Sequence, residues 1–164
     1  MNNTWHIRSK TGSVCGLTII HQSQEVIYIM NTFVELHSLG SVQVNMRNIT
    51  HVIPVFTNDG YFNAGIFFTG KERVSDDLPH YSIEENIETI IEKCRAKHIQ
   101  DIVILHTARG KTIVNTSNII LMEKRPTDKN YKTEIYFVGC KKLSSGMSVK
   151  ETQEEIVKLM GNNE

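Results

Sequence analysis

The sequence has few cysteines, which cross-link small folds, and no closely spaced pair of histidines to hold a metal ion. Its 164 residues include only three cysteines, an odd number at wide spacing with no Cys-x-x-Cys pair. This pattern does not support a disulfide framework, and it is typical of reduced, mostly buried cysteines in intracellular proteins. No His-x-His or His-x-x-x-His pair has the spacing of metal ligands. We therefore expect no metal ion and no other cofactor.

An excess of either charge and long apolar runs are also missing. The 18 basic and 18 acidic residues cancel, and the isoelectric point is near 7.1. Proteins that bind nucleic acid without sequence preference usually carry a basic excess, because phosphate neutralisation supplies much of their affinity. No run approaches the ~20 apolar residues of a membrane-spanning helix, and the N-terminus has no apolar signal segment. We therefore expect a cytoplasmic protein that acts away from membranes.

Sequence motifs of enzymes are absent as well. There is no Gly-x-Ser-x-Gly, no phosphate-binding loop and no dinucleotide fingerprint. His37 and His106 occupy matching places in the chain, and with Asp76 and Asp77 they are the best candidates for a hydrolase site. Isolated surface histidines and polar loop acids are far commoner than catalytic ones. We therefore expect no catalytic residues, and a small hydrolase is only the third functional hypothesis.

What the sequence does contain is an internal duplication. Val34-Glu-Leu-His37 matches Val103-Ile-Leu-His106, which lies 69 residues further on. After a turn glycine, Asn45-Met-Arg-Asn48-Ile49 matches Asn115-Thr-Ser-Asn118-Ile119 at a distance of 70 residues. Identities at several separated places indicate two related units rather than chance.

The duplication predicts how the chain is organised. Residues 1–30 form an N-terminal arm or β-hairpin, residues 31–98 the first repeat and residues 99–164 the second. Each repeat is expected to be a β-meander closed by one helix, which gives the fold class α+β. A unit of roughly 65 residues buries little surface by itself. We therefore expect the two repeats to form one compact domain with pseudo-twofold symmetry.

Alternating apolar residues bounded by turn residues predict matching strands in the two repeats. The strands expected in the first repeat are Phe33–His37, Ser41–Asn45, Ile49–Phe56, Ala64–Thr69 and Glu72–Val74. Those expected in the second are Ile102–His106, Lys111–Asn115, Ile119–Met122, Thr133–Val138 and Lys141–Leu143. The N-terminal hairpin would consist of Val14–Ile20 and Val26–Met30.

Each repeat is expected to end in an amphipathic helix. Ser82 with Glu85, and Ser148 with Glu151, have the Ser-x-x-Glu spacing of a capping box, in which each side chain bonds to the backbone amide of the other. An apolar stripe at helical spacing follows in both places. Helices are therefore predicted to begin at Ser82 and at Ser148.

This pattern of elements resembles a known family. An apolar strand, a turn glycine, a strand ending in Asn, a Gly-Lys turn and a helix after Ser-x-x-Glu resemble the small flagellar FlbD/SwrD-like proteins. Val103–Met160 carries the resemblance best, and Val34–Cys94 carries it with a longer loop. The resemblance implies an accessory protein that acts through protein contacts and not as an enzyme. A second likeness, at the level of fold only, is to Pur-alpha-type repeats, which bind single-stranded nucleic acid.

Basic and amide side chains near the turns are the candidate binding residues. They are Asn45, Arg47, Arg73, Arg109, Lys111, Asn115 and Lys142. If the repeats pair, the basic residues gather on one rim and receive an anion, while Phe67 and Tyr136 stack on bases. The alternative is that the basic residues protect strand edges and that the asparagines cap the bends between strands.

The leading functional hypothesis is a non-catalytic interaction module that binds a protein partner and self-associates. Neutral charge, the missing catalytic motifs and the duplication favour it. The alternative is a protein that binds single-stranded nucleic acid or nucleotides through the basic rim.

Overall fold

The structure is a computed structural model that describes residues 32–57, 60–70, 78–139 and 146–161. The chain divides into two units after Met30, and the described residues all belong to the second unit. The predicted N-terminal hairpin therefore lies outside the described residues. So do the strands predicted at Glu72–Val74 and Lys141–Leu143.

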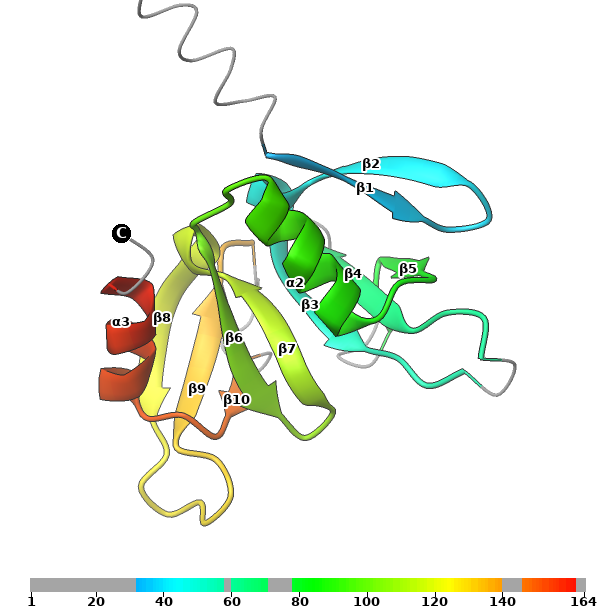
Figure 1. The fold of residues 1–164 in the computed structure, drawn as a ribbon. Helices are drawn as coiled ribbons and strands as arrows, with labels where there is room; N and C mark the ends of the chain where they lie inside the picture. The colour runs from blue at the N-terminus through cyan, green and yellow to red at the C-terminus, as the bar shows by residue number, and fades with distance from the viewer. Residues whose placement is uncertain (1–31, 58–59, 71–77, 140–145, 162–164) are drawn as a thin grey trace, which may run out of the picture. The chain divides into compact units, whose positions relative to one another are not determined.

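The first half of the described unit, residues 32–98, runs from a hairpin to a helix (Figure 1). Its elements are β1 (Phe33–His37), β2 (Ser41–Asn45), the 3₁₀ turn η1 (Met46–Asn48), β3 (Ile49–Pro54), β4 (Ala64–Phe68), β5 (Tyr81–Ile83) and α2 (Ile87–Ala96).

The second half, residues 99–161, has its elements in the same order. They are β6 (Ile102–Thr107), β7 (Gly110–Asn115), the 3₁₀ turn η2 (Thr116–Asn118), β8 (Ile119–Lys124), β9 (Thr133–Phe137), β10 (Met147–Val149) and α3 (Gln153–Gly161).

All strand pairs in the described residues are antiparallel and form three sheets. The hairpin β1–β2 stands alone, and β8, β9 and β10 form a second sheet. The third sheet has the order β5-β4-β3-β7-β6 and contains strands of both halves. It joins the halves because β3 pairs with β7, with His51 opposite Val114 and Val52 opposite Ile113. We call this pairing the joint.

Two apolar clusters form the core, and the joint connects them. The cluster of the first half packs residues such as Leu36, Ile66 and Ile90 together and also takes in Ile113 of the second half. The cluster of the second half contains Phe137 and Ile156, among others. A side chain on β7 thus completes the core of the first half.

The turns that follow β4 and β9 lie against each other. Gly70 and Gly139 both have positive φ, 74° and 87°, a conformation that favours glycine. A Cβ at Gly139 would stand 2.8 Å from the backbone nitrogen of Gly70. Glycine is therefore required at position 139 for conformation and for space alike.

These features show the predicted α+β class, but the predicted pseudo-twofold packing is not confirmed. A twofold axis that pairs β3 with β7 would also pair β8 with β2, the strands at the corresponding places. Within the described residues β2 pairs only with β1 and β8 only with β9. The described strand pairing between the halves is thus one-sided.

The predicted helix starts at Ser82 and Ser148 are wrong. Ser82 lies in β5 opposite Gly65, and Ser148 lies in β10 opposite Glu134, because each serine continues an alternating strand. The helix α2 begins after Asn86, whose side chain accepts a hydrogen bond from the Thr89 amide at 2.9 Å.

The second helix does have a capping box, but one turn later than predicted. The Thr152 amide donates to Glu155 Oε2 at 2.8 Å. In return, the Glu155 amide donates to Thr152 Oγ1 at 3.2 Å. The chain therefore carries two consecutive Ser/Thr-x-x-Glu patterns here, and only the second one caps a helix.

Candidate functional site

The two asparagines that begin the 3₁₀ turns act as caps, one of the roles expected from the sequence. Asn45 Oδ1 accepts a hydrogen bond from the Arg47 amide at 3.0 Å. Asn115 Oδ1 accepts one from the Ser117 amide at the same distance. Both bonds satisfy a backbone donor where a strand bends, which is the usual work of Asn at such places.

Asn115 and Asn118 also hold the joint, a role that the sequence did not reveal. Asn115 Nδ2 donates across the joint to the Met46 carbonyl at 2.7 Å and to the Arg47 carbonyl at 3.2 Å. Asn118 Nδ2 donates to the carbonyls of Arg47 and Ile49 at 2.8 and 2.6 Å. Asn115 is only 1% exposed, so these bonds satisfy backbone groups of η1 that are largely shielded from water.

His51 sits at the joint between rings of both halves. Its imidazole stacks on Phe67 with ring centres 4.3 Å apart, and on Phe137 of the second half at 5.2 Å. Its Nδ1 lies 2.9 Å from Thr50 Oγ1. Because it is 3% exposed, this histidine contributes to packing between the halves.

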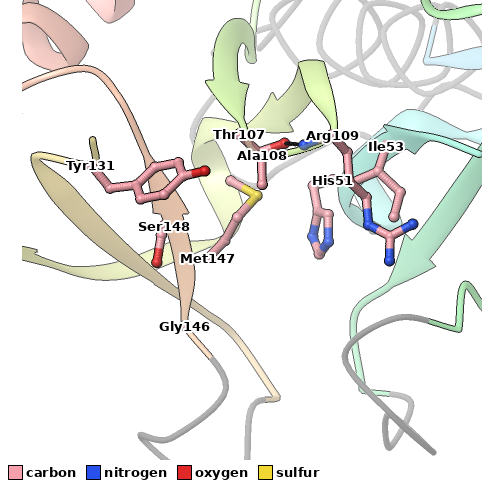
Figure 2. A pocket seen from close by; sticks show the side chains of 9 residues that line it. All are labelled: His51, Ile53, Thr107, Ala108, Arg109, Tyr131, Gly146, Met147 and Ser148. Atoms are coloured by element: carbon pink, nitrogen blue, oxygen red, sulfur yellow. Dashed lines mark hydrogen bonds between the residues drawn. The ribbon is translucent and has the colours of Figure 1, made fainter. Parts of the chain in front are cut away.

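Arg109 lines a cavity of about 260 Å³ beside the joint. Figure 2 shows the Arg109 side chain near His51 and Ile53 of β3, with Tyr131 across the cavity. The other lining residues are Thr107, Ala108, Gly146, Met147 and Ser148. The walls thus combine one guanidinium with a largely apolar surface, and they come from both halves.

Of the predicted binding residues, the structure brings Asn45, Arg47 and Asn115 together, because both asparagines bond to the backbone of Arg47. Lys111 forms an ion pair with Glu88 at 3.2 Å, away from the cavity that Arg109 lines. Arg47 belongs to η1, and the backbone carbonyl of Arg47 accepts hydrogen bonds from Asn115 and Asn118 across the joint. Arg73 and Lys142 lie outside the described residues. The predicted basic rim therefore stays a prediction.

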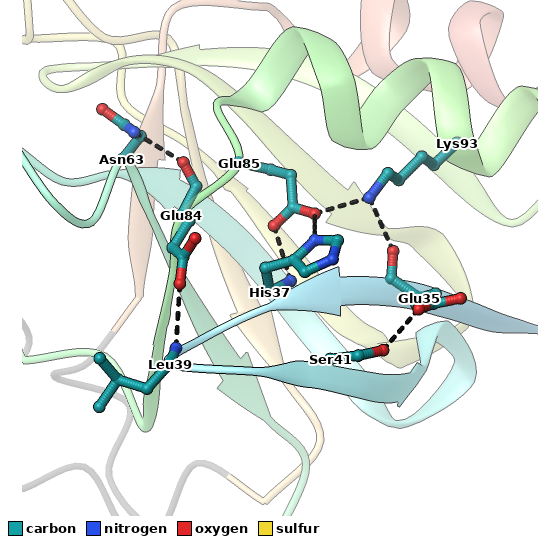
Figure 3. Close-up of polar contacts among 8 residues, drawn as sticks. All are labelled: Glu35, His37, Leu39, Ser41, Asn63, Glu84, Glu85 and Lys93. Atoms are coloured by element: carbon teal, nitrogen blue, oxygen red, sulfur yellow. Dashed lines mark hydrogen bonds and ion pairs between the residues drawn. The ribbon is translucent and has the colours of Figure 1, made fainter.

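His37 and His106 occupy corresponding places, and each pairs with a glutamate. His37 Nδ1 lies 2.8 Å from Glu85 Oε1, and the His37 amide donates to Glu85 Oε2 at 2.9 Å (Figure 3). His106 Nδ1 lies 2.6 Å from Glu151 Oε1, and its amide donates to the same carboxylate at 3.1 Å. Each pair ties the end of a hairpin strand to the segment that leads into the helix.

Among the described residues, only the first of these glutamates also binds a lysine. Lys93 Nζ donates to Glu85 Oε1 at 2.6 Å and to the Glu35 carbonyl at 2.9 Å (Figure 3). Burial raises the pKa of Glu85, but the bonds from Lys93 and from His37 outweigh it and bring the pKa down to about 2. Glu85 is thus a permanently charged anchor at neutral pH.

Chemically reactive groups are scarce in the described part of the chain. Burial raises the pKa of the Cys94 thiol to about 12, so it is protonated and unreactive at neutral pH. Among the described residues no group of three or more His, Cys, Asp or Glu side chains is placed to hold a metal ion. In the same residues, no helix has the length and apolarity to span a membrane.

An apolar surface on the second half is the feature that sequence reasoning missed. Ile120 and Leu121 of β8 are 59% and 40% exposed, and Val157 of α3 is 57% exposed. The residues at the corresponding places in the first half are Thr50, His51 and Ile91, which are 4%, 3% and 9% exposed. We call Ile120, Leu121 and Val157 the β8–α3 surface. The helix α3 lies beside β8 (Figure 1).

Comparisons with family models, with curated proteins and with solved structures found no match to this chain. The resemblances to FlbD/SwrD-like proteins and to Pur-alpha-type repeats therefore stay predictions.

Proposed function

We propose that the chain is a non-catalytic interaction module built from two tandem copies of one unit, and that it binds a protein through the β8–α3 surface. The observation that carries the proposal is the exposure of Ile120, Leu121 and Val157 at places where the first half is buried. Exposed apolar side chains along a strand edge and on an adjacent helix are typical of protein interaction sites.

Corresponding strand registers support the tandem relation of the two halves. In each half a bulge interrupts the pairing of the third and fourth strands after its first pair. The pairs on either side of the bulge are Ile49–Phe68 and His51–Phe67 in the first half, and Ile119–Phe137 and Leu121–Tyr136 in the second. A bulge at the same place in both halves is a specific shared feature, because bulges are conserved devices within families.

Backbone hydrogen bonds outside the sheets also correspond. The Glu84 amide donates to the His37 carbonyl at 2.8 Å, and the Lys150 amide donates to the His106 carbonyl at 2.9 Å. A second pair of backbone bonds matches as well: the Thr69 amide donates to the Asn48 carbonyl at 2.8 Å, and the Val138 amide donates to the Asn118 carbonyl at 2.9 Å. Such agreement supports one unit used twice.

Strand addition is the binding mode that suits β8. Within the described residues only β9 pairs with β8. At the other edge of β8, the Met122 carbonyl accepts a hydrogen bond from Gln153 Nε2 at 2.6 Å, and an added strand would replace this side-chain bond with backbone bonds. In strand addition the backbone bonds provide affinity, and alternate side chains provide specificity. Ile120 and Leu121 would be covered in this way.

The histidines and acids of the described residues support a non-catalytic role. His37 and His106 each bind a carboxylate that anchors the chain between strand and helix. The nucleic-acid alternative stays a prediction. Of its proposed basic residues, Lys111 is paired with an acid on α2.

A pull-down with matched variants tests the proposal. The immobilised full chain is exposed to a lysate of the source cells, and retained proteins are compared between wild type and the double variant Ile120→Lys, Leu121→Lys. We expect retention to fall at least tenfold, because two lysines on the edge disfavour strand addition. The control is Phe56→Lys, which charges an equally apolar side chain that is 84% exposed on the first half. Equal retention by wild type and the double variant would overturn the proposal.

A further inference from the structure

The joint has two surfaces, and each half carries both of them. One surface is the outer edge of the strand that follows the 3₁₀ turn, and the first half contributes it to the joint as the edge of β3. The other is the outer edge of the strand that precedes the 3₁₀ turn, and the second half contributes it as the edge of β7. The strands at the corresponding places are β8 and β2. Within the described ranges neither edge has a strand beside it. Within the described residues, one copy of each joint surface therefore has no strand on it, and on β8 a side chain, that of Gln153, bonds to the Met122 carbonyl instead.

The asparagines of the first half provide an independent observation. Asn115 and Asn118 reach across the joint with their Nδ2 groups to the carbonyls of η1. Asn45 and Asn48 stand at the corresponding places, yet within the described residues nothing accepts a hydrogen bond from the Nδ2 of either one. Capping explains why Asn45 is retained, but it does not explain Asn48, which is exposed. Donation across a second joint explains both.

The exposed apolar residues match the area that a second joint would cover. Ile91 of α2 is 9% exposed and belongs to the same cluster as Ile113 of β7. Val157 of α3 occupies the place of Ile91 and is 57% exposed. His51 is covered in part by Phe137 of the second half, and Leu121, in its place, is 40% exposed. Val157 and Leu121 thus lack the cover that the second half gives to Ile91 and His51 of the first half.

We propose that a second copy of this chain occupies the β8–α3 surface, with its β2 antiparallel to β8 in the register of the joint. This register places Leu121 of one copy opposite Val44 of the other, and Met122 opposite Gln43. Asn45 and Asn48 of the arriving copy then donate to backbone carbonyls of η2. The inference rests on the proposed function, because it names the partner of the same surface.

The contact is weaker than the joint within one chain. Gln43 stands where the joint has Ile113, which is fully buried, so less apolar area is removed from water. The association is therefore reversible and depends on concentration. Because the contact joins two different surfaces, repeated use of it gives a closed ring or an extended chain.

Disulfide trapping between two variants, each with one introduced cysteine, tests the register. Cys15 and Cys140 are replaced by serine in both, and Cys94 stays because its thiol is buried and protonated. Met122→Cys is mixed with Gln43→Cys, or with Ser41→Cys as a control. Gln43 and Ser41 are both exposed and lie on the same side of β2. The control shifts the pairing by two residues, which takes the Cα atoms beyond the ~7 Å that a disulfide can bridge.

We expect Met122→Cys to cross-link with Gln43→Cys at least tenfold faster than with Ser41→Cys. Light scattering on the full chain should show mass rising with concentration, and Asn48→Ala should weaken this association about tenfold. Asn130→Ala, which removes an exposed amide away from both edges, should leave it unchanged. Equal cross-linking rates, or a monomer at all concentrations, would overturn the inference. In that case, β8-dependent retention of another protein would still support the proposed function.

Discussion

The strands β3 and β8 occupy the same place in the two halves and yet differ in environment. Ile49, Thr50 and Val52 of β3 are at most 4% exposed, because β3 lies between β4 and β7. Four of the six residues of β8 are exposed, and within the described residues this strand pairs with β9 alone. A strand's burial here depends on whether another unit follows it.

The two halves also divide their polar contacts unequally. Asn115 serves as a cap and as a donor across the joint, whereas Asn45 caps its own turn. Glu85 binds a histidine and a lysine, whereas Leu159 stands where the second half would need that lysine. Matched substitutions at these pairs measure the difference.

The largest effect is expected at the joint. Asn115→Ala should lower the free energy of unfolding by about 3 kcal/mol, because it takes the Asn115 donor away from the buried Met46 carbonyl and also removes a cap. Asn45→Ala should cost about 1 kcal/mol, the usual loss for a cap alone. Urea unfolding, followed by circular dichroism at a concentration below that of any association, measures both. Equal losses would mean that the bonds across the joint add no stability.

A smaller effect is expected at the two glutamates. Glu85→Gln should lower the free energy of unfolding by about 2 kcal/mol at pH 7, and Glu151→Gln by about 1 kcal/mol, since hydrogen bonds to charged groups are the stronger ones and Glu85 has the additional lysine. Chemical unfolding of both variants beside wild type gives the two losses. A larger loss for Glu151→Gln would reverse the comparison.

The loss at Glu85 should also depend on pH. Its pKa is about 2 in the folded protein, against an ordinary value of 4.5. A lowered folded pKa stabilises the fold above the ordinary pKa, and this stabilisation disappears as pH falls through the folded pKa. The gap between wild type and Glu85→Gln should therefore be complete above about pH 4.5 and close toward pH 2. A gap that stays constant over this range would show that the charge of Glu85 is not its source.

The smallest effect is expected at the ion pair that links β7 to α2. Lys111 and Glu88 are more than half exposed, so water and salt screen their attraction. Lys111→Ala should leave the thermal unfolding midpoint unchanged within the error of the measurement. A clear fall in the midpoint would show that this pair contributes to holding the halves together.

Most strands followed from local sequence. Phe33–His37 and Ser41–Asn45 have the predicted bounds, and the other strands predicted within the described residues differ by one or two residues at an end. Alternating apolar residues and turn glycines set these bounds, and both are local properties of the chain. Within the described residues, the prediction missed the short strands β5 and β10, because Ser-x-x-Glu resembles a helix start.

The sequence by itself determined that the chain is α+β and which segments become strands, because strand periodicity and turn residues act within a few neighbours. Only the tertiary structure decided that Glu85 and Glu151 bind histidines and that Asn115 and Asn118 join the halves. These partners are separated by 45 to 71 residues, and no local pattern specifies them. The exposure of Ile120, Leu121 and Val157 also depends on what the neighbouring unit covers, and that is a property of packing.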